Sequence, residues 1–167
     1  MKTLKQHINE ALKIGKDLSE WSAYSCQPKT KKELETIIFK RIKEQGHNCD
    51  LNDIDTSLID DMAYLFFETE FVGDISKWNV SNCTTMLGMF YKSRFNKDIS
   101  NWNVSNVRSM KHMFIDSIFT GDISNWDVSN VINMSGMFDE STFNQDISNW
   151  KISKDCDVRD MFDRCPI

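Results

Sequence analysis

Five aspartates recur at a fixed spacing and have the clearest capacity for chemistry: Asp50, Asp74, Asp98, Asp122 and Asp146 lie 24 residues apart. If the segments between them stack as coils, neighbouring carboxylates lie about 5 Å apart and repel each other unless something compensates their charge. Calcium ions between the coils would do so, as in nonapeptide β-helices, and so would backbone N–H groups donated to each carboxylate at a turn. Because the sequence has no Gly-Gly-x-Gly-x-Asp pattern, we expect the turn role and no metal site.

The serines, histidines and cysteines form no catalytic or zinc-binding pattern. A serine recurs with the same period, at Ser57, Ser81, Ser105, Ser129 and Ser153. A nucleophilic serine needs a base beside it, but the three histidines (His7, His47 and His112) follow no period. The five cysteines are scattered and lack the spacing of zinc ligands. We therefore expect no catalytic residues, no cofactor and no enzyme activity.

These columns belong to an internal repeat that organises most of the chain. Five units of 24 residues follow one another without an insertion over 50–167, and their apolar positions align. The phenylalanine column, for example, contains Phe66, Phe90, Phe114, Phe138 and Phe162. Such regular repetition predicts one supersecondary unit stacked on copies of itself, each burying its apolar side on its neighbours.

Each unit predicts one coil with a short strand and a short helical segment. The apolar positions of ISKWNVSNC (75–83) match the opening of a leucine-rich repeat. Trp78 and Val80 alternate with polar residues, which predicts a strand over 77–81, and the apolar spacing over 83–90 predicts one or two helical turns. The predicted fold class is α/β: a short right-handed leucine-rich-repeat-like solenoid of five coils with an N-terminal helical cap.

The repeat motif F-N-x-D-I-S-x-W-N-V-S-N-V-x-x-M-x-x-M-F resembles the BspA-type leucine-rich repeat, which is also abundant in mycoplasma surface lipoproteins. The resemblance covers residues 50–167. It implies a leucine-rich-repeat-like solenoid, a cell-surface location, and roles in adhesion and protein binding. It brings no catalytic residues with it.

The segment before the repeats predicts two helices. Residues 30–49 contain a capping helix, because Thr30 and Glu33 form a capping box and Gly46 is a natural stop. Such a helix would cover the open end of the stack, as terminal repeats require. Residues 1–29 are predicted to be a leader helix, over 3–18, and a linker.

The opening MKTLKQHINEALKI also resembles short leader helices on proteins of tailed phages of gut bacteria. The segment Ile8-Asn9-Glu10 before Ala11 fits the loose I/L-x-E pattern that phage prohead proteases cut. We favour an amphipathic helix that docks on the cap or on a partner over a processing signal.

The charge of the chain is divided unevenly. Residues 1–48 carry ten Lys and Arg against six Asp and Glu, whereas residues 49–167 carry ten against nineteen. A nucleic-acid groove needs a basic face, so the acidic repeats indicate no nucleic-acid partner. No stretch approaches the ~20 apolar residues of a membrane span, and the N-terminus lacks the apolar core of a signal peptide. We expect a cytoplasmic or virion-associated protein.

The residues that the repeat leaves variable are the candidates for contact with a partner. On the predicted strand face they are Lys77, Asn79, Asn103 and Asp127. On a ridge over 91–118 they are Tyr91, Arg94, Ile115 and Ile118. Because small apolar clusters on a variable surface are typical of protein contacts, we predict a non-enzymatic protein-binding or adhesion module. The alternative is a structural or accessory protein of a phage virion or similar assembly, docked through residues 1–20.

Overall fold

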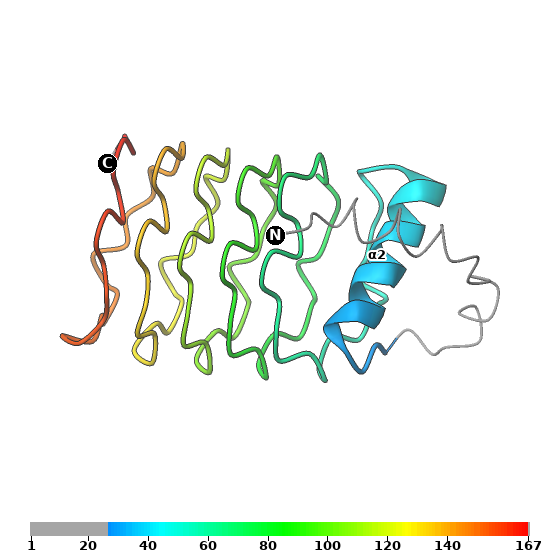
Figure 1. Cartoon of the computed structure of the whole chain (residues 1–167), viewed down its shortest axis with the longest axis horizontal. Coiled ribbons are helices and arrows are strands. Elements are labelled where there is room, and N and C mark those ends of the chain that lie inside the picture. The colour runs from blue at the N-terminus through cyan, green and yellow to red at the C-terminus, as the bar shows by residue number, and fades with distance from the viewer. Residues whose placement is uncertain (1–26, 167) are drawn as a thin grey trace.

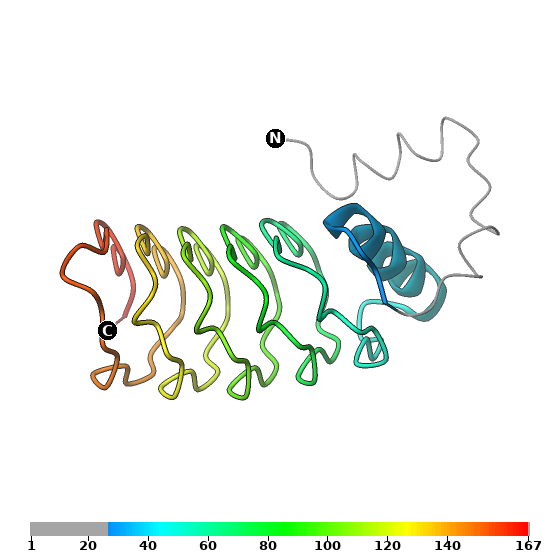
Figure 2. The ribbon, with the colours of Figure 1, turned by 90° about the horizontal axis from the view of Figure 1, so that it is seen from below.

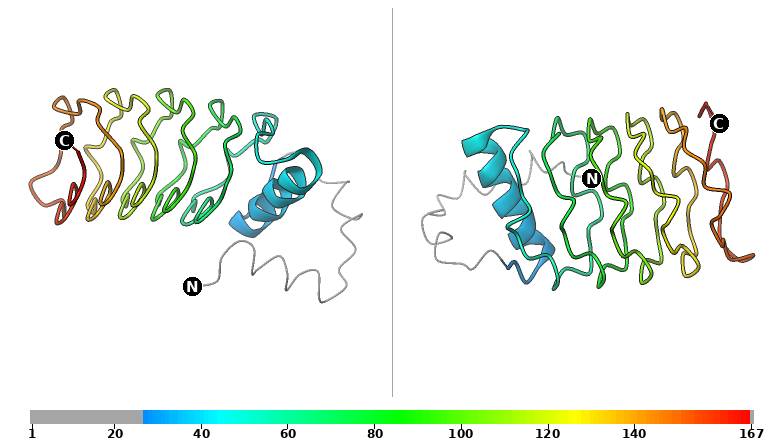
Figure 3. Two further views of the ribbon diagram at one scale, coloured as in Figure 1. Left: turned by 90° about the horizontal axis from the view of Figure 1, so that it is seen from above. Right: turned by 180° about the vertical axis from the view of Figure 1, so that it is seen from behind.

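The computed structural model describes residues 27–166. A helix, α2 (Lys31–Gln45), is followed by coils that lie side by side along the long axis of the molecule (Figure 1). A quarter turn shows the coils edge-on, with α2 at their N-terminal end (Figure 2). The further views place α2 at the same end (Figure 3). The predicted leader helix over 3–18 lies outside the described residues, as does nearly all of the predicted 1–29 segment.

Helix α2 forms where the capping residues predict it. The Thr30 side chain accepts a hydrogen bond from the backbone N–H of Glu33 at 3.2 Å, and Gly46 ends the helix with a φ of 87°. Leu34 and Ile38 are fully buried against the first coil. The helix therefore covers the apolar side that the first coil would otherwise expose.

The predicted fold class, an α/β leucine-rich-repeat-like solenoid, is wrong. Within the described part of the chain α2 is the only helix, and the repeats form isolated parallel bridges without a strand or a sheet. The strand expected over 77–81 is absent, and two of its amides are bonded within their own coil instead of to a neighbouring backbone. The N–H of Trp78 donates to the carbonyl of Ile75, and the N–H of Ser81 donates to the side chain of Asn79. Amides used within their own coil cannot pair with a neighbouring coil.

The helical turns expected over 83–90 are also absent. Gly88 and Lys92 have φ angles of 57° and 52°, in the left-handed region that a right-handed helix does not include. The N–H groups of Met86, Gly88, Phe90 and Lys92 instead donate to carbonyls of the next coil, each at 2.9 Å. Equivalent bonds cross every junction between the coils. We call the segments that carry them the ladder face: 61–69, 85–93, 109–117, 133–141 and 157–165.

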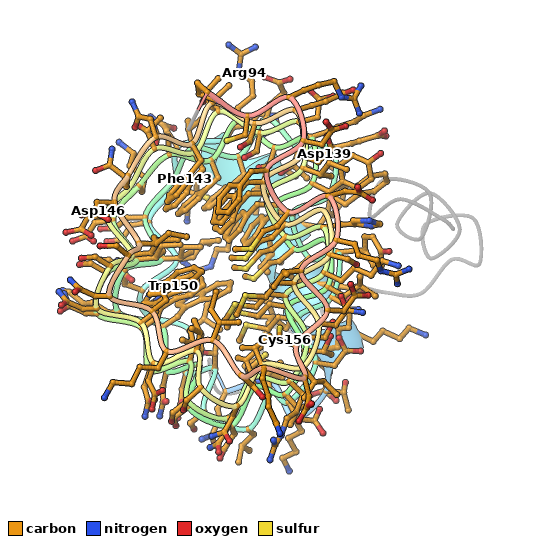
Figure 4. The ribbon with its side chains drawn as sticks, turned by 90° about the vertical axis from the view of Figure 1, so that its left-hand side faces the viewer. Arg94, Asp139, Phe143, Asp146, Trp150 and Cys156 are labelled. Carbon is orange, nitrogen blue, oxygen red and sulfur yellow. The ribbon has the colours of Figure 1, made fainter. Side chains whose placement is uncertain are left out.

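The interior of the stack contains the apolar columns that the repeat predicts. The phenylalanine rings of one column lie in nearly parallel pairs with centroids 5.5–5.7 Å apart: Phe66, Phe90, Phe114, Phe138 and Phe162. Each buried indole N–H donates to a backbone carbonyl of the preceding coil, from Trp78, Trp102, Trp126 and Trp150. In a view along the stack, Phe143 and Trp150 point inward, whereas Arg94, Asp139 and Asp146 point outward (Figure 4).

Candidate functional site

The aspartate column forms turns. Each carboxylate accepts a hydrogen bond from the backbone N–H two residues ahead, at 2.8 or 2.9 Å, in Asp50, Asp74, Asp98, Asp122 and Asp146. This confirms the predicted turn role. Residues 27–166 contain no group of three or more His, Cys, Asp or Glu placed to hold a metal ion.

The turn bonds also change the acidity of these carboxyls. The backbone hydrogen bond from the serine two residues ahead is the largest cause that lowers the pKa, in Asp74, Asp98, Asp122 and Asp146. A carboxyl whose pKa is lower in the folded chain contributes stability above its unfolded pKa, here 3.8. This contribution is lost as the pH falls through the folded pKa. We therefore expect the column to make the fold sensitive to acid.

We expect Asp98→Asn with Asp122→Asn to reduce this sensitivity. Asparagine can accept the same turn bond but does not titrate, so the double variant should lose less thermal stability than the wild type between pH 5 and about pH 2. The measurement is the melting temperature at several pH values, with each protein compared with itself at neutral pH. Identical losses in both proteins would contradict a role of these carboxyls in the acid response.

The predicted strand-face contacts have a structural role as well. The side-chain oxygen of Asn79 accepts both the N–H of Ser81, at 3.1 Å, and its hydroxyl, at 2.7 Å. The same pair of bonds joins Asn103 to Ser105 and Asp127 to Ser129. Lys77 is exposed on the same side of the coil, with its backbone N–H bonded to Asn52. The structure thus brings these candidates onto one face but uses three of them to close turns.

A further asparagine column was missed by the sequence analysis. Its side-chain amides donate across the coil junction to serine carbonyls of the preceding coil at 2.6–2.8 Å, from Asn82, Asn106 and Asn130. The signal was the Ser-Asn pair that recurs with the repeat period. These amides tie the polar face of one coil to the next, whereas the turn bonds act within each coil.

Three of the described cysteines, Cys49, Cys83 and Cys156, have thiols that favour the protonated form. Burial raises the pKa of the Cys83 thiol to about 12, and it also raises the pKa of the Cys49 and Cys156 thiols. A thiol must ionise to act as a nucleophile, so these environments disfavour cysteine catalysis at neutral pH.

The predicted ridge residues lie on or beside the ladder face. Tyr91 and Ile115 are half-buried and occupy one column, whereas Arg94 and Ile118 are exposed and occupy the column three residues later. Figure 4 shows Arg94 at the edge of the coil and Asp139, which shares the Tyr91 column, on the ladder face. Arg94 forms an ion pair with Glu70, with Nε 3.4 Å from the carboxylate oxygen.

Two aromatic residues of the first coil extend this surface. The Phe67 ring lies 5.1 Å from the Tyr91 ring and 5.8 Å from the Tyr64 ring, measured between centroids. Phe67, Tyr91 and Ile115 are 24 residues apart, a signal that the sequence analysis did not use. We call Tyr64, Phe67, Tyr91 and Ile115 the aromatic ridge.

Charged side chains border the aromatic ridge. The Lys92 ammonium lies 5.5 Å from the centroid of the Tyr91 ring and 3.9 Å from the Glu68 carboxylate. In the fourth and fifth coils the column of Phe67, Tyr91 and Ile115 continues as Asp139 and Asp163. Arg164 forms ion pairs with both Asp139 and Glu140. The aromatic and aliphatic residues of this column are therefore confined to the first three coils.

Comparison with known proteins places the chain in a family. Two matches to one family model cover residues 33–118 and 115–166; that family is described as a Mycoplasma protein of unknown function, DUF285. No curated protein and no solved structure gives a significant match to the chain. No helix in the described residues is long and apolar enough to cross a membrane. The narrower resemblances to the BspA-type repeat and to phage leader helices stay predictions. The resemblance to a mycoplasma-type repeat is confirmed, because the chain belongs to the DUF285 family.

Proposed function

We propose that this chain is a non-enzymatic protein-binding module that contacts its partner through the aromatic ridge. The observation that carries the proposal is the group of half-buried aromatic side chains on an outer face of the stack. Aromatic and aliphatic side chains with a polar rim are typical of the centres of protein interfaces. The charged residues Glu68 and Lys92 would form part of that rim.

The packing of the coils supports recognition by outward side chains. Phe90 and Phe114 are fully buried and their rings stack on those of the neighbouring coils, so the interior is filled by the protein itself. Identical outward positions present the same chemistry in every coil. Only residues that depart from the repeat can therefore distinguish one partner from another, and Tyr91 and Ile115 are such departures on the ladder face.

We expect Tyr91→Ala with Ile115→Asp to weaken binding of a partner at least ~10-fold, or about 1.4 kcal/mol. The variant removes the ring that packs on Phe67 and places a charge in the apolar column. The partner would first be isolated from the native source by pull-down and identified by mass spectrometry. Its affinity for the wild type and the variant would then be measured by calorimetry, with circular dichroism to confirm folding.

A matched control changes the opposite side of the coil. Asn101→Lys with Asn125→Lys adds two charges in the column where Lys77 is already tolerated, and both asparagines are exposed. We expect this control to bind normally. Normal binding by the ridge variant, together with loss of binding by the control, would overturn the proposed contact surface and assign it to the other face.

A further inference from the structure

The aromatic ridge follows the long axis of the stack. Backbone N–H groups beside it donate at 2.9 Å to carbonyls of the column that contains Tyr91: from Lys92 to Ile115, from Asp116 to Asp139 and from Glu140 to Asp163. These bonds hold each member of the column next to the equivalent residue of the following coil. The column therefore offers an occupant one side chain per coil, along the direction in which the coils succeed one another (Figures 1 and 2).

The step from coil to coil decides which kind of backbone can follow the column. The Phe67 and Tyr91 rings lie 5.1 Å apart, and the buried rings of the phenylalanine column lie 5.5–5.7 Å apart, between centroids. One turn of an α-helix advances about 5.4 Å, which falls within this range. A strand presents a side chain on one face every ~6.6–6.8 Å, about 1 Å or more beyond each step. A helix laid along the stack therefore keeps register with the column, and a strand does not.

The chemistry of this surface changes along its length. The first three coils present the aromatic and aliphatic side chains of the ridge. Over the third to fifth coils, the column and the one beside it carry four carboxylates and one guanidinium: Asp116, Asp139, Glu140, Asp163 and Arg164. Arg164 pairs with three of these carboxylates, so an excess of negative charge remains. We call these five residues the acidic end.

We propose, on the basis of the proposed function, that the aromatic ridge docks an amphipathic α-helix of the partner, laid along the stack with one turn over each coil. Three successive turns place apolar side chains on the ridge, and the next two place Lys or Arg over the acidic end. Such a helix is apolar at i, i+4 and i+7 and basic at i+11 and i+14. Amphipathic helices bind other proteins through anchors of this spacing.

The test adds synthetic peptides to the full chain. Two fluorescently labelled peptides of about 18 residues, or five turns, carry leucine at the apolar positions and lysine at the basic ones, in opposite directions along the peptide. Glutamine and serine fill the other positions, so that the free peptides have little helix. We expect saturable binding of one peptide by anisotropy and a gain in helicity by circular dichroism. Absence of binding by both up to about 1 mM, or binding without a gain in helicity, would overturn the proposal.

A pair of charge variants locates the basic turns. Glu140→Gln with Asp163→Asn removes two exposed carboxylates from the acidic end and should weaken peptide binding about threefold. Asp122→Asn with Asp146→Asn is the matched control, since it removes the same charge from the opposite side of the coil, where Figure 4 shows Asp146. The control should bind the peptide as the wild type does. Equal weakening by both variants would contradict contact with the acidic end, because binding would then follow net charge alone.

The ridge variant separates this proposal from the proposed function. Tyr91→Ala with Ile115→Asp should weaken peptide binding at least about tenfold, and unchanged binding would refute docking of the helix on the ridge. If the isolated partner depends on the ridge but neither peptide binds, the proposed function stands and the helix is refuted. If a peptide depends on the ridge but the affinity of the partner does not, the proposed function fails instead.

Discussion

Phe114→Ala is expected to lower the free energy of unfolding by about 3–5 kcal/mol. The Phe114 ring is fully buried in the third coil, stacked between Phe90 at 5.5 Å and Phe138 at 5.7 Å, with Phe119 at 4.4 Å. Removing it leaves a cavity in the middle of the stack, where neighbouring coils on both sides limit collapse. Urea unfolding followed by tryptophan fluorescence would measure the change.

Phe162→Ala is the matched control for this variant. It lies in the same column, but its ring is 36% exposed and stacks on Phe138 alone within that column. We expect its truncation to cost less than half as much as that of Phe114. Equal costs would mean that the column is not a continuous core in which each ring depends on both neighbours.

Gly73→Ala is expected to destabilise the chain by about 1–3 kcal/mol. A Cβ atom at this position would lie 2.0 Å from the backbone carbonyl oxygen of Cys49 and 2.6 Å from the Phe71 ring. A backbone atom cannot move aside as a side chain can, so the junction between α2 and the first two coils would have to shift. Thermal unfolding of the variant would show the loss.

Gly121→Ala tests whether this cost comes from the close approach of the Cys49 backbone or from the repeat position that Gly73 and Gly121 share. Its Cβ would contact the Phe119 ring at 2.7 Å and no backbone atom is among its nearest neighbours. The same column holds Lys97 and Gln145 in other coils, so larger side chains are compatible with it. We expect a clearly smaller loss than for Gly73→Ala. A loss as large as that of Gly73→Ala would refute the close approach of Cys49 as the cause.

The inward columns and the turn role of the aspartates were predictable because both depend on the repeat period. A residue such as Phe114 that recurs at every coil must occupy the same place in each, and an apolar column then lies inside. Asp98 illustrates the second case, since a carboxylate two residues before a serine is typical of a side chain that closes a turn. The position of α2 followed from its capping residues Thr30 and Gly46.

The strand and helix predictions failed for a physical reason that spacing does not reveal. Trp78 and Val80 alternate with polar residues as in a strand, yet the Asn79 side chain accepts hydrogen bonds from the N–H and hydroxyl of Ser81 and closes a turn. Met86 and Met89 have helical spacing, yet the left-handed conformation of Gly88 directs the amides to the next coil. Apolar periodicity reports which side chains face inward, and several backbone paths satisfy the same periodicity.

The residues of the aromatic ridge, which we propose as the contact surface, were predicted only in part from the sequence. Tyr91 and Ile115 were found because they depart from the repeat, but Tyr64 and Phe67 lie in the first coil, whose sequence is the most divergent and hides the shared column. Asn103 and Asp127 stood out as polar and outward, and they are exposed, but their oxygens bond to Ser105 and Ser129. A polar residue at the surface can therefore serve the fold as much as a partner.

Site-specific photo-cross-linking to the isolated partner tests the aromatic ridge as the contact surface most directly. A photoreactive phenylalanine analogue would be placed at Tyr91 in one protein and at Asn101, on the opposite side of the coil, in another. We predict that illumination joins the partner to the chain from position 91 and not from position 101. Cross-links from position 101 without any from position 91 would contradict binding through the aromatic ridge.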